Sequence, residues 1–304
     1  MTIRSMLKKL ALICLIILLL IASIVGGFWL YFHPSYTRQD GIVYTQRHGH
    51  DLTFDIIRPH NTNGLGILLM VSGGWKSKTN SFQPWIAAPL LRHGYTVFAV
   101  YHLEQPKATV MEIVSDVERA TRFIRYHAAE YGIDPNRLGV TGGSAGGHLS
   151  LMLATRGTNG PAQDPDPVNR ASSSVQAAAI FYPVTDLLNL GKSTENLGDG
   201  GPPKSFVKAF GPDSTNLAKW KIIGHDMSPI YHVHSNMPPL LIYHGGADTL
   251  TPIDQSERYQ TAARAVGGKV ELVVVPGKMH GWPTMVWDIR HFARWFDEHL
   301  LPRK

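Results

Sequence analysis

The chain has 304 residues, of which 44% are hydrophobic and 17% are charged, and its formal net charge is +6. This composition excludes a disordered or collagen-like chain and leaves enough apolar residues for one large core. The only cysteine, Cys14, lies in the N-terminal apolar run, which excludes an intramolecular disulfide and a thiolate metal site in the rest of the chain.

The N-terminal region is predicted to anchor the protein in a membrane. Residues 1–9 are basic, and residues 10–32 carry no charge and are long enough to cross a bilayer as a helix. We therefore expect a cytoplasmic N-terminus and a single-pass protein of the inner or plasma membrane, with its larger part periplasmic or extracellular. The alternative is a cleaved signal peptide and a secreted protein. We favour the anchor, because the apolar run exceeds a usual signal core and no clean A-x-A site follows it.

Residues 33–40 are predicted to form a linker, and residues 41–304 a single domain. Two roughly alternating runs on either side of residues 48–51 predict an antiparallel hairpin at its start. A helical period over Thr109–Gly132 predicts the best-marked helix. The segment from about residue 186 to 236 is predicted to be an insertion that forms a lid.

Short apolar runs recur between the helical stretches of this domain. Near-continuous apolar strands that alternate with helices are typical of a parallel sheet covered on both faces. The fold class is therefore predicted to be α/β, with a mostly parallel central sheet flanked by helices. The predicted strands are Ile67–Val71, Thr96–Val100, Arg137–Thr141, Val175–Tyr182, Pro239–His244 and Lys269–Val275.

The stretch GGSAG, Gly142 to Gly146, fits the motif G-x-S-x-G. It follows a predicted strand and precedes a helical run, which is the setting in which this motif holds a serine at a sharp turn. Small residues on both sides allow the backbone to pass close to its neighbours. We therefore predict Ser144 as a nucleophile.

A serine hydroxyl is a weak nucleophile at neutral pH, so it needs a histidine base that a carboxylate orients. In this kind of fold the acid follows a late strand and the histidine follows the last one. Asp248 and His280 come after the last two predicted strands in that order. They are predicted to complete a triad with Ser144.

Hydrolysis of an acyl compound also requires amide donors for the oxyanion. We expect one from Ala145, which follows the predicted nucleophile, and others from Gly73 and Gly74 in a glycine loop after an early strand. Trp75 and the predicted insertion are expected to line the substrate site.

These segments resemble the α/β-hydrolase superfamily, and within it the BD-FAE-like esterases, which are related to acetyl-xylan and feruloyl esterases, carboxylesterases and the hormone-sensitive-lipase group. The similarity covers most of the chain from about residue 41, including EYGIDPNRLGVTGGSAGGHLS and VPGKMHGW. The resemblance implies the same triad and the same oxyanion donors. Two neighbouring positions depart from it. Relatives typically read His-Gly-Gly-Gly-Trp, whereas this chain has Val71 and Ser72 before the two glycines.

The sequence therefore predicts a membrane-anchored serine esterase that cleaves carboxylic esters through an acyl-enzyme. Aminoacyl or peptide hydrolysis of the prolyl-oligopeptidase type is the enzymatic alternative, and a non-catalytic binding protein on a hydrolase fold is the other. We expect an ester substrate, either small or linked to a glycan, with no cofactor, no metal and no nucleic-acid partner. The oligomeric state is left open.

Overall fold

The computed structural model describes residues 3–302, and its centre is an eight-stranded sheet in the order β1-β2-β4-β3-β5-β6-β7-β8. β1 and β2 pair antiparallel, as do β2 and β4, and all later pairs are parallel. The sheet is therefore mostly parallel, as predicted. The strands are β1 Tyr36–Arg47, β2 His50–Pro59, β3 Gly66–Met70, β4 Thr96–Val100, β5 Leu138–Gly143, β6 Ala177–Phe181, β7 Leu240–Gly245 and β8 Val270–Val275.

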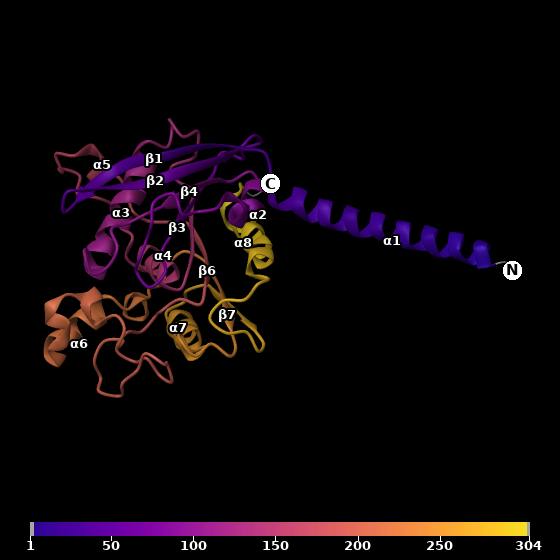
Figure 1. The fold of residues 1–304 in the computed structure, drawn as a ribbon. Helices are drawn as coiled ribbons and strands as arrows, with labels where there is room; N and C mark the ends of the chain where they lie inside the picture. The colour runs from indigo at the N-terminus through magenta and orange to yellow at the C-terminus, as the bar shows by residue number, and fades with distance from the viewer. Residues whose placement is uncertain (1–2, 303–304) are drawn as a thin grey trace.

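Helices cover both faces of this sheet (Figure 1). β4 is largely apolar because both of its faces are covered. Phe98 packs into the core cluster that contains α3 and α4, and its neighbour Val97 packs into the cluster that contains α2 and α8. All five positions of β4 are buried. The α-helices are α1 Ile3–Phe32, α2 Ala88–Arg92, α3 Val110–Tyr126, α4 Ala145–Arg156, α5 Pro167–Arg170, α6 Leu217–Asp226, α7 Asp254–Ala265 and α8 Met285–Leu300, and the 3-10 helices are η1 Pro84–Ala87, η2 Val207–Phe210, η3 Pro212–Thr215 and η4 Pro229–His232.

The start of the domain differs from the sequence expectation. β1 begins at Tyr36, which pairs with Pro59 of β2, so most of the expected linker 33–40 belongs to the sheet. The reason is that β1 is an edge strand with many exposed positions, and its polar composition resembles that of a linker. Only residues 33–35 separate α1 from β1.

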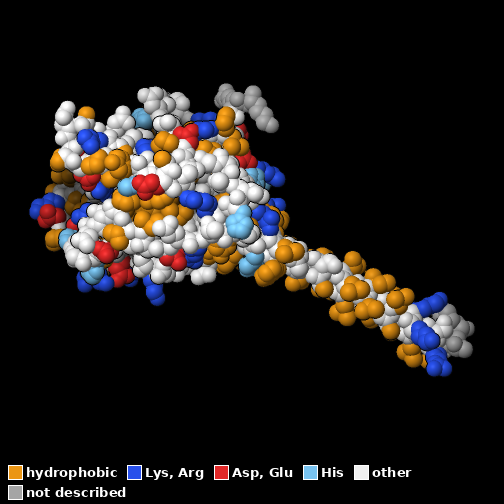
Figure 2. Space-filling model, turned by 90° about the horizontal axis from the view of Figure 1, so that it is seen from above, with side chains coloured by type: hydrophobic (Ala, Val, Ile, Leu, Met, Phe, Trp, Pro, Cys, Tyr) orange, Lys and Arg blue, Asp and Glu red, His pale blue; other side chains and the backbone are white. Residues whose placement is uncertain are grey.

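Helix α1 projects from the domain (Figure 1) and has no buried residue. It is the only helix within residues 3–302 that is long and apolar enough to span a membrane, with a mean hydropathy of 3.0. Figure 2 shows hydrophobic side chains along this helix and Lys and Arg side chains near its free end.

The segment between β6 and β7 contains η2, η3, α6 and η4. It lies at the same end of the domain as α7 in Figure 1. β5, β6 and β7 are parallel neighbours, so their carboxyl ends meet at one edge of the sheet. The predicted site residues that follow these strands are therefore brought together there.

Candidate active site

Ser144 lies at the sharp turn between β5 and α4, with φ 55° and ψ −121°. This backbone conformation is unfavourable for a residue with a side chain, and such strain is typical of functional turns. The flanking glycines are needed for space. A Cβ on Gly142 would lie 2.5 Å from the Gly146 carbonyl oxygen, and one on Gly146 would lie 2.5 Å from the Met70 carbonyl oxygen.

The structure brings Ser144, His280 and Asp248 into one hydrogen-bonded chain. His280 Nδ1 lies 2.7 Å from Asp248 Oδ2, and His280 Nε2 lies 2.9 Å from Ser144 Oγ. An ionised carboxylate only accepts hydrogen bonds, so Nδ1 donates to Asp248 and Nε2 is left to accept from the serine hydroxyl. This is the tautomer that a general base at Nε2 requires.

Asp248 is buried, and its surroundings favour its charged form. Burial opposes ionisation, but hydrogen bonds from His244 and His280 and from the Thr251 amide outweigh it and hold the pKa of Asp248 well below its usual range. The amides of Leu250 and Thr251 each donate to Asp248 Oδ1 at 2.9 Å. The carboxylate is thereby fixed in place and kept ionised.

His244 is completely buried at the end of β7. Its Nε2 lies 2.7 Å from the Thr251 carbonyl oxygen and 3.4 Å from Asp248 Oδ2. Its Nδ1 lies 2.7 Å from Ser256 Oγ. The carbonyl only accepts, so Nε2 carries the proton, and this histidine supports the loop that presents Asp248.

Two backbone amides beside Ser144 are suited to hold an oxyanion. Ala145 is the first residue of α4, where an amide has no partner within the helix. Gly74, with φ +56°, lines the same cavity as Ser144 and Ala145. Gly73 differs from the expectation, because its amide donates to the Lys76 carbonyl at 3.0 Å in a tight turn and is therefore not free.

Residues 71–76, which we call the glycine loop, contact two buried histidines. His102 Nε2 lies 2.8 Å from Ser72 Oγ, and the Trp75 indole Nε1 donates to His148 Nδ1 at 3.2 Å. His102 is not among the residues predicted from the sequence. The signal that could have found it is its place directly after a buried strand, at the edge where the predicted site lies.

Burial lowers the pKa of His102 and that of His148 to about 4. An unfolded chain binds protons at these histidines below about pH 6.5, whereas the folded chain does not until about pH 4. The contribution of these two histidines to the free energy of unfolding should therefore be constant above pH 6.5 and fall between pH 6.5 and 4, by up to about 1.4 kcal/mol per pH unit for each.

Urea unfolding of the detergent-solubilised chain at several pH values measures this slope. The variant His102→Gln should be less stable than the original chain but should show a shallower slope, because one of the two groups has been removed. A free energy of unfolding that stays constant from pH 7 to 5 would contradict the assignment of both histidines as neutral.

A cavity of about 80 Å³ adjoins Ser144, and its wall is mostly apolar. Trp75 lines it but is only 2% exposed, because its ring packs against Phe206 and Phe210. Only those atoms of Trp75 that reach the cavity can therefore take the predicted part in substrate binding. The apolar residues at this cavity are Trp75, Ala145, Val184, Leu190, Pro203, Phe206, Leu250 and Pro252.

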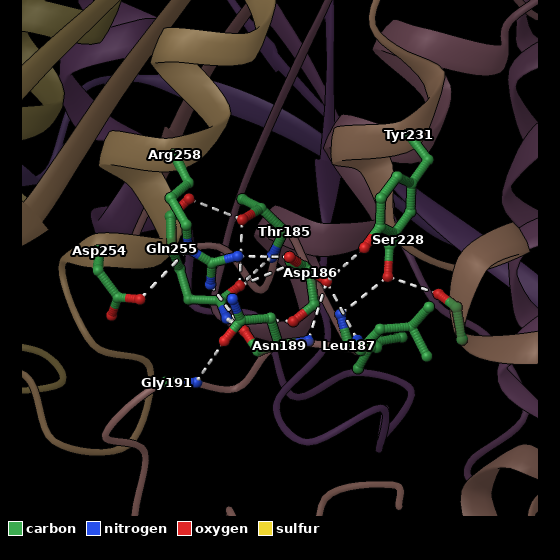
Figure 3. A network of polar contacts seen from close by, with 12 residues as sticks. Thr185, Asp186, Leu187, Asn189, Gly191, Ser228, Tyr231, Asp254, Gln255 and Arg258 are labelled. Carbon is green, nitrogen blue, oxygen red and sulfur yellow. Dashed lines mark hydrogen bonds and ion pairs between the residues drawn. The ribbon is translucent and has the colours of Figure 1, made fainter. Parts of the chain in front are cut away.

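Figure 3 shows how α7 holds the first residues of the segment between β6 and β7. Gln255 Oε1 accepts from the amides of Thr185 and Asp186 at 3.0 and 2.8 Å. Its Nε2 donates to the Asn189 carbonyl oxygen at 2.8 Å, and Arg258 pairs with the Asp186 carboxylate. Gln255 also lines the cavity, so this network fixes one wall of it.

The sheet topology, the turn at Ser144 and the late Asp248 and His280 together define an α/β-hydrolase fold. The family model BD-FAE matches residues 54–262. The chain belongs to this family.

Two curated relatives come from Mycobacterium tuberculosis, strain ATCC 25618 / H37Rv. "Probable carboxylic ester hydrolase LipM" is 31% identical over 75% of this chain and 52% of its own length, and "Esterase LipQ" is 32% identical over 71% and 50%. The chain spans about half the length of these relatives. Among solved structures, Thermogutta terrifontis esterase 2 phosphonylated by sarin has a TM-score of 0.67 and 25% identity, over 89% of this chain and 98% of that one.

Proposed function

We propose that the chain is a membrane-anchored serine esterase that hydrolyses carboxylic esters, with Ser144 as nucleophile, His280 as base and Asp248 as the orienting acid. The observation that carries this proposal is the hydrogen-bonded chain from Ser144 Oγ through His280 to Asp248. The relatives named as esterases support the same reaction class.

The reaction follows from the geometry of these residues. Ser144 Oγ attacks the ester carbonyl carbon while His280 Nε2 takes its proton, and the carbonyl oxygen becomes an oxyanion. The amides of Gly74 and Ala145, which line the same cavity as Ser144, would donate to that oxygen. His280 then gives the proton to the leaving alkoxide, which departs as the alcohol. Water attacks the acyl-enzyme in the same way and releases the carboxylic acid.

The small apolar cavity favours short acyl chains. Its volume of about 80 Å³ and its apolar wall suit an acyl group of a few carbons, while a decanoyl chain would have to leave the cavity. We expect kcat/KM on p-nitrophenyl esters to fall at least about 10-fold between butyrate and decanoate, a loss that one or two badly placed methylenes can cause. Turnover should require Ser144. A rising rate up to decanoate would contradict the assigned acyl site, and no turnover of any ester by folded protein would contradict the function.

Retention of α1 is supported by contacts between its last turns and the domain. Trp287 of α8 packs against Phe28 at a ring-centroid distance of 5.3 Å and against Tyr31 at 5.2 Å. Arg92 of α2 donates to the Tyr31 carbonyl oxygen at 2.6 Å. A segment that signal cleavage removes has no need of partners on the mature domain.

We therefore expect the full chain with a C-terminal tag to stay in the membrane fraction after a carbonate wash. Its intact mass should still include the α1 residues, because the apolar run spans the bilayer and remains attached. The orientation follows from the basic N-terminus, which we propose stays in the cytoplasm while the domain lies outside it. A soluble, exported form that begins after α1 would contradict anchoring but would leave the esterase proposal intact.

A further inference from the structure

The glycine loop is held from two sides by histidines that take no part in the proposed proton transfers. His102 follows β4, and its Nε2 lies 2.8 Å from Ser72 Oγ. His148 belongs to α4, and its Nδ1 accepts the Trp75 indole N–H at 3.2 Å. Both imidazoles are buried.

The second ring nitrogen of each histidine determines which of its two nitrogens carries the proton. His102 Nδ1 lies 2.9 Å from the Leu103 carbonyl oxygen, and His148 Nε2 lies 2.7 Å from the Met227 carbonyl oxygen. A carbonyl only accepts, so each of these nitrogens carries the proton. The facing nitrogen of each ring is therefore an acceptor, and the Ser72 hydroxyl and the Trp75 indole donate to them.

The loop between these two contacts needs such support. Gly74 and Trp75 both have positive φ values, 56° and 54°; glycine adopts such a value freely, whereas Trp75 carries a side chain and is strained there. An oxyanion donor must be held close to its final position to stabilise the transition state. Ser72 and Trp75 flank the Gly74 amide, so their side-chain hydrogen bonds restrain both sides of it.

His148 also connects the loop to the nucleophile. Its amide donates to the Ser144 carbonyl at 2.9 Å, one turn into α4. The hydrogen bond from Trp75 therefore ties the Gly74 side of the oxyanion site to the helix that carries Ser144 and Ala145. The hydrogen bond from His148 Nε2 to the Met227 carbonyl oxygen also connects the segment between β6 and β7 to these contacts.

We propose that His102 and His148 are positioning residues that hold the Gly74 amide in register with the Ala145 amide, through Ser72 and Trp75 respectively. This inference rests on the proposed function, because it assigns the two histidines to the oxyanion site of that reaction. Neither histidine touches the substrate or exchanges a proton with it.

The test compares variants of the full chain in detergent. Ser72→Ala removes the hydroxyl that donates to His102, Ser72→Thr keeps a hydroxyl, and Trp75→Phe removes the indole N–H but keeps an aromatic ring. Thr155→Val is the matched control, because it removes a buried hydroxyl bonded to the Leu151 carbonyl on α4, away from the loop. Each variant is assayed for kcat and KM on p-nitrophenyl acetate.

We expect kcat to fall about 10-fold in Ser72→Ala and Trp75→Phe, which is what loss of one hydrogen bond of typical strength gives when it acts only in the transition state. KM should change less than 2-fold in Ser72→Ala, and Ser72→Thr should recover most of kcat. Thr155→Val should melt at a lower temperature with kcat unchanged. An equal kcat in Ser72→Ala and Thr155→Val would overturn the proposal.

Amide hydrogen exchange of the glycine loop gives a second readout that does not depend on turnover. Exchange in residues 72–76 should be faster in Ser72→Ala and Trp75→Phe than in Thr155→Val, because the loop has lost one of its two side-chain hydrogen bonds to the buried histidines. Unchanged exchange in both loop variants would overturn this inference even if the original chain is an active esterase. Faster exchange in a chain without ester turnover would support the restraint and contradict only the proposed function.

Discussion

Replacing Ser144 with alanine should reduce kcat on p-nitrophenyl acetate by roughly 10⁴-fold or more. In the proposed reaction the Ser144 hydroxyl forms the acyl bond, and without it His280 Nε2 would have no proton to take. The amides of Gly74 and Ala145 would remain, so a small residual rate over water is expected. The measurement is kcat of the detergent-solubilised full chain, at a protein concentration high enough to detect that residual rate.

The matched control for this variant is Ser174→Ala. This variant also removes a serine hydroxyl, but one that lies outside the site and donates to the Gly157 carbonyl oxygen at 2.9 Å. Its kcat should stay within about 2-fold of the original, since an ordinary hydrogen bond of this kind contributes about 1 kcal/mol to stability and nothing to the reaction. Retention of substantial turnover in Ser144→Ala would contradict the assignment of the nucleophile.

Asp248→Asn should give the second largest effect, a loss of roughly 10⁴-fold in kcat with little change in fold. The asparagine oxygen can still accept from the amides of Leu250 and Thr251 at the Oδ1 position. Its amide nitrogen would then face His280 Nδ1 and donate to it. This reverses the imidazole tautomer, so Nε2 would carry a proton and could not accept one from Ser144.

Asp166→Asn is the corresponding control, because Asp166 accepts from the Val168 amide at 2.9 Å as an N-cap of α5, outside the site. We expect its kcat to be unchanged. A loss of kcat in Asp248→Asn could come from the reversed tautomer of His280 or from a shift in the pKa of the general base. The pH dependence of kcat separates these two explanations. A changed tautomer lowers kcat at every pH at which the protein is folded. A base with a shifted pKa would instead recover full activity at high pH, and such recovery would contradict the explanation by the tautomer.

The sequence was sufficient to predict the order of the fold and the three residues that meet at the site. G-x-S-x-G marks a local strand–turn–helix, and Asp248 and His280 each follow an apolar strand directly, so local patterns place all three at one edge of a parallel sheet. The hydrogen bonds between them are consistent with that placement. Their catalytic roles stay predictions until the variants are measured.

The support of the glycine loop could not be predicted in the same way. The sequence has Val71 where relatives typically have a histidine, and the structure places another histidine, His102, which follows the neighbouring strand β4, against Ser72. That contact depends on the pairing of β3 with β4, which no local pattern encodes. The engagement of the Gly73 amide with Lys76 likewise follows from the exact turn and not from residue type.

Reaction with a fluorophosphonate probe shows whether Ser144 is an activated nucleophile. The full chain in detergent is treated with the probe, and the labelled peptide is mapped by mass spectrometry. We expect one label per chain, on Ser144, at a rate that falls strongly in His280→Ala because the base is then missing. Folded protein that takes up no label, or takes it up on another serine, would contradict the assignment of the nucleophile.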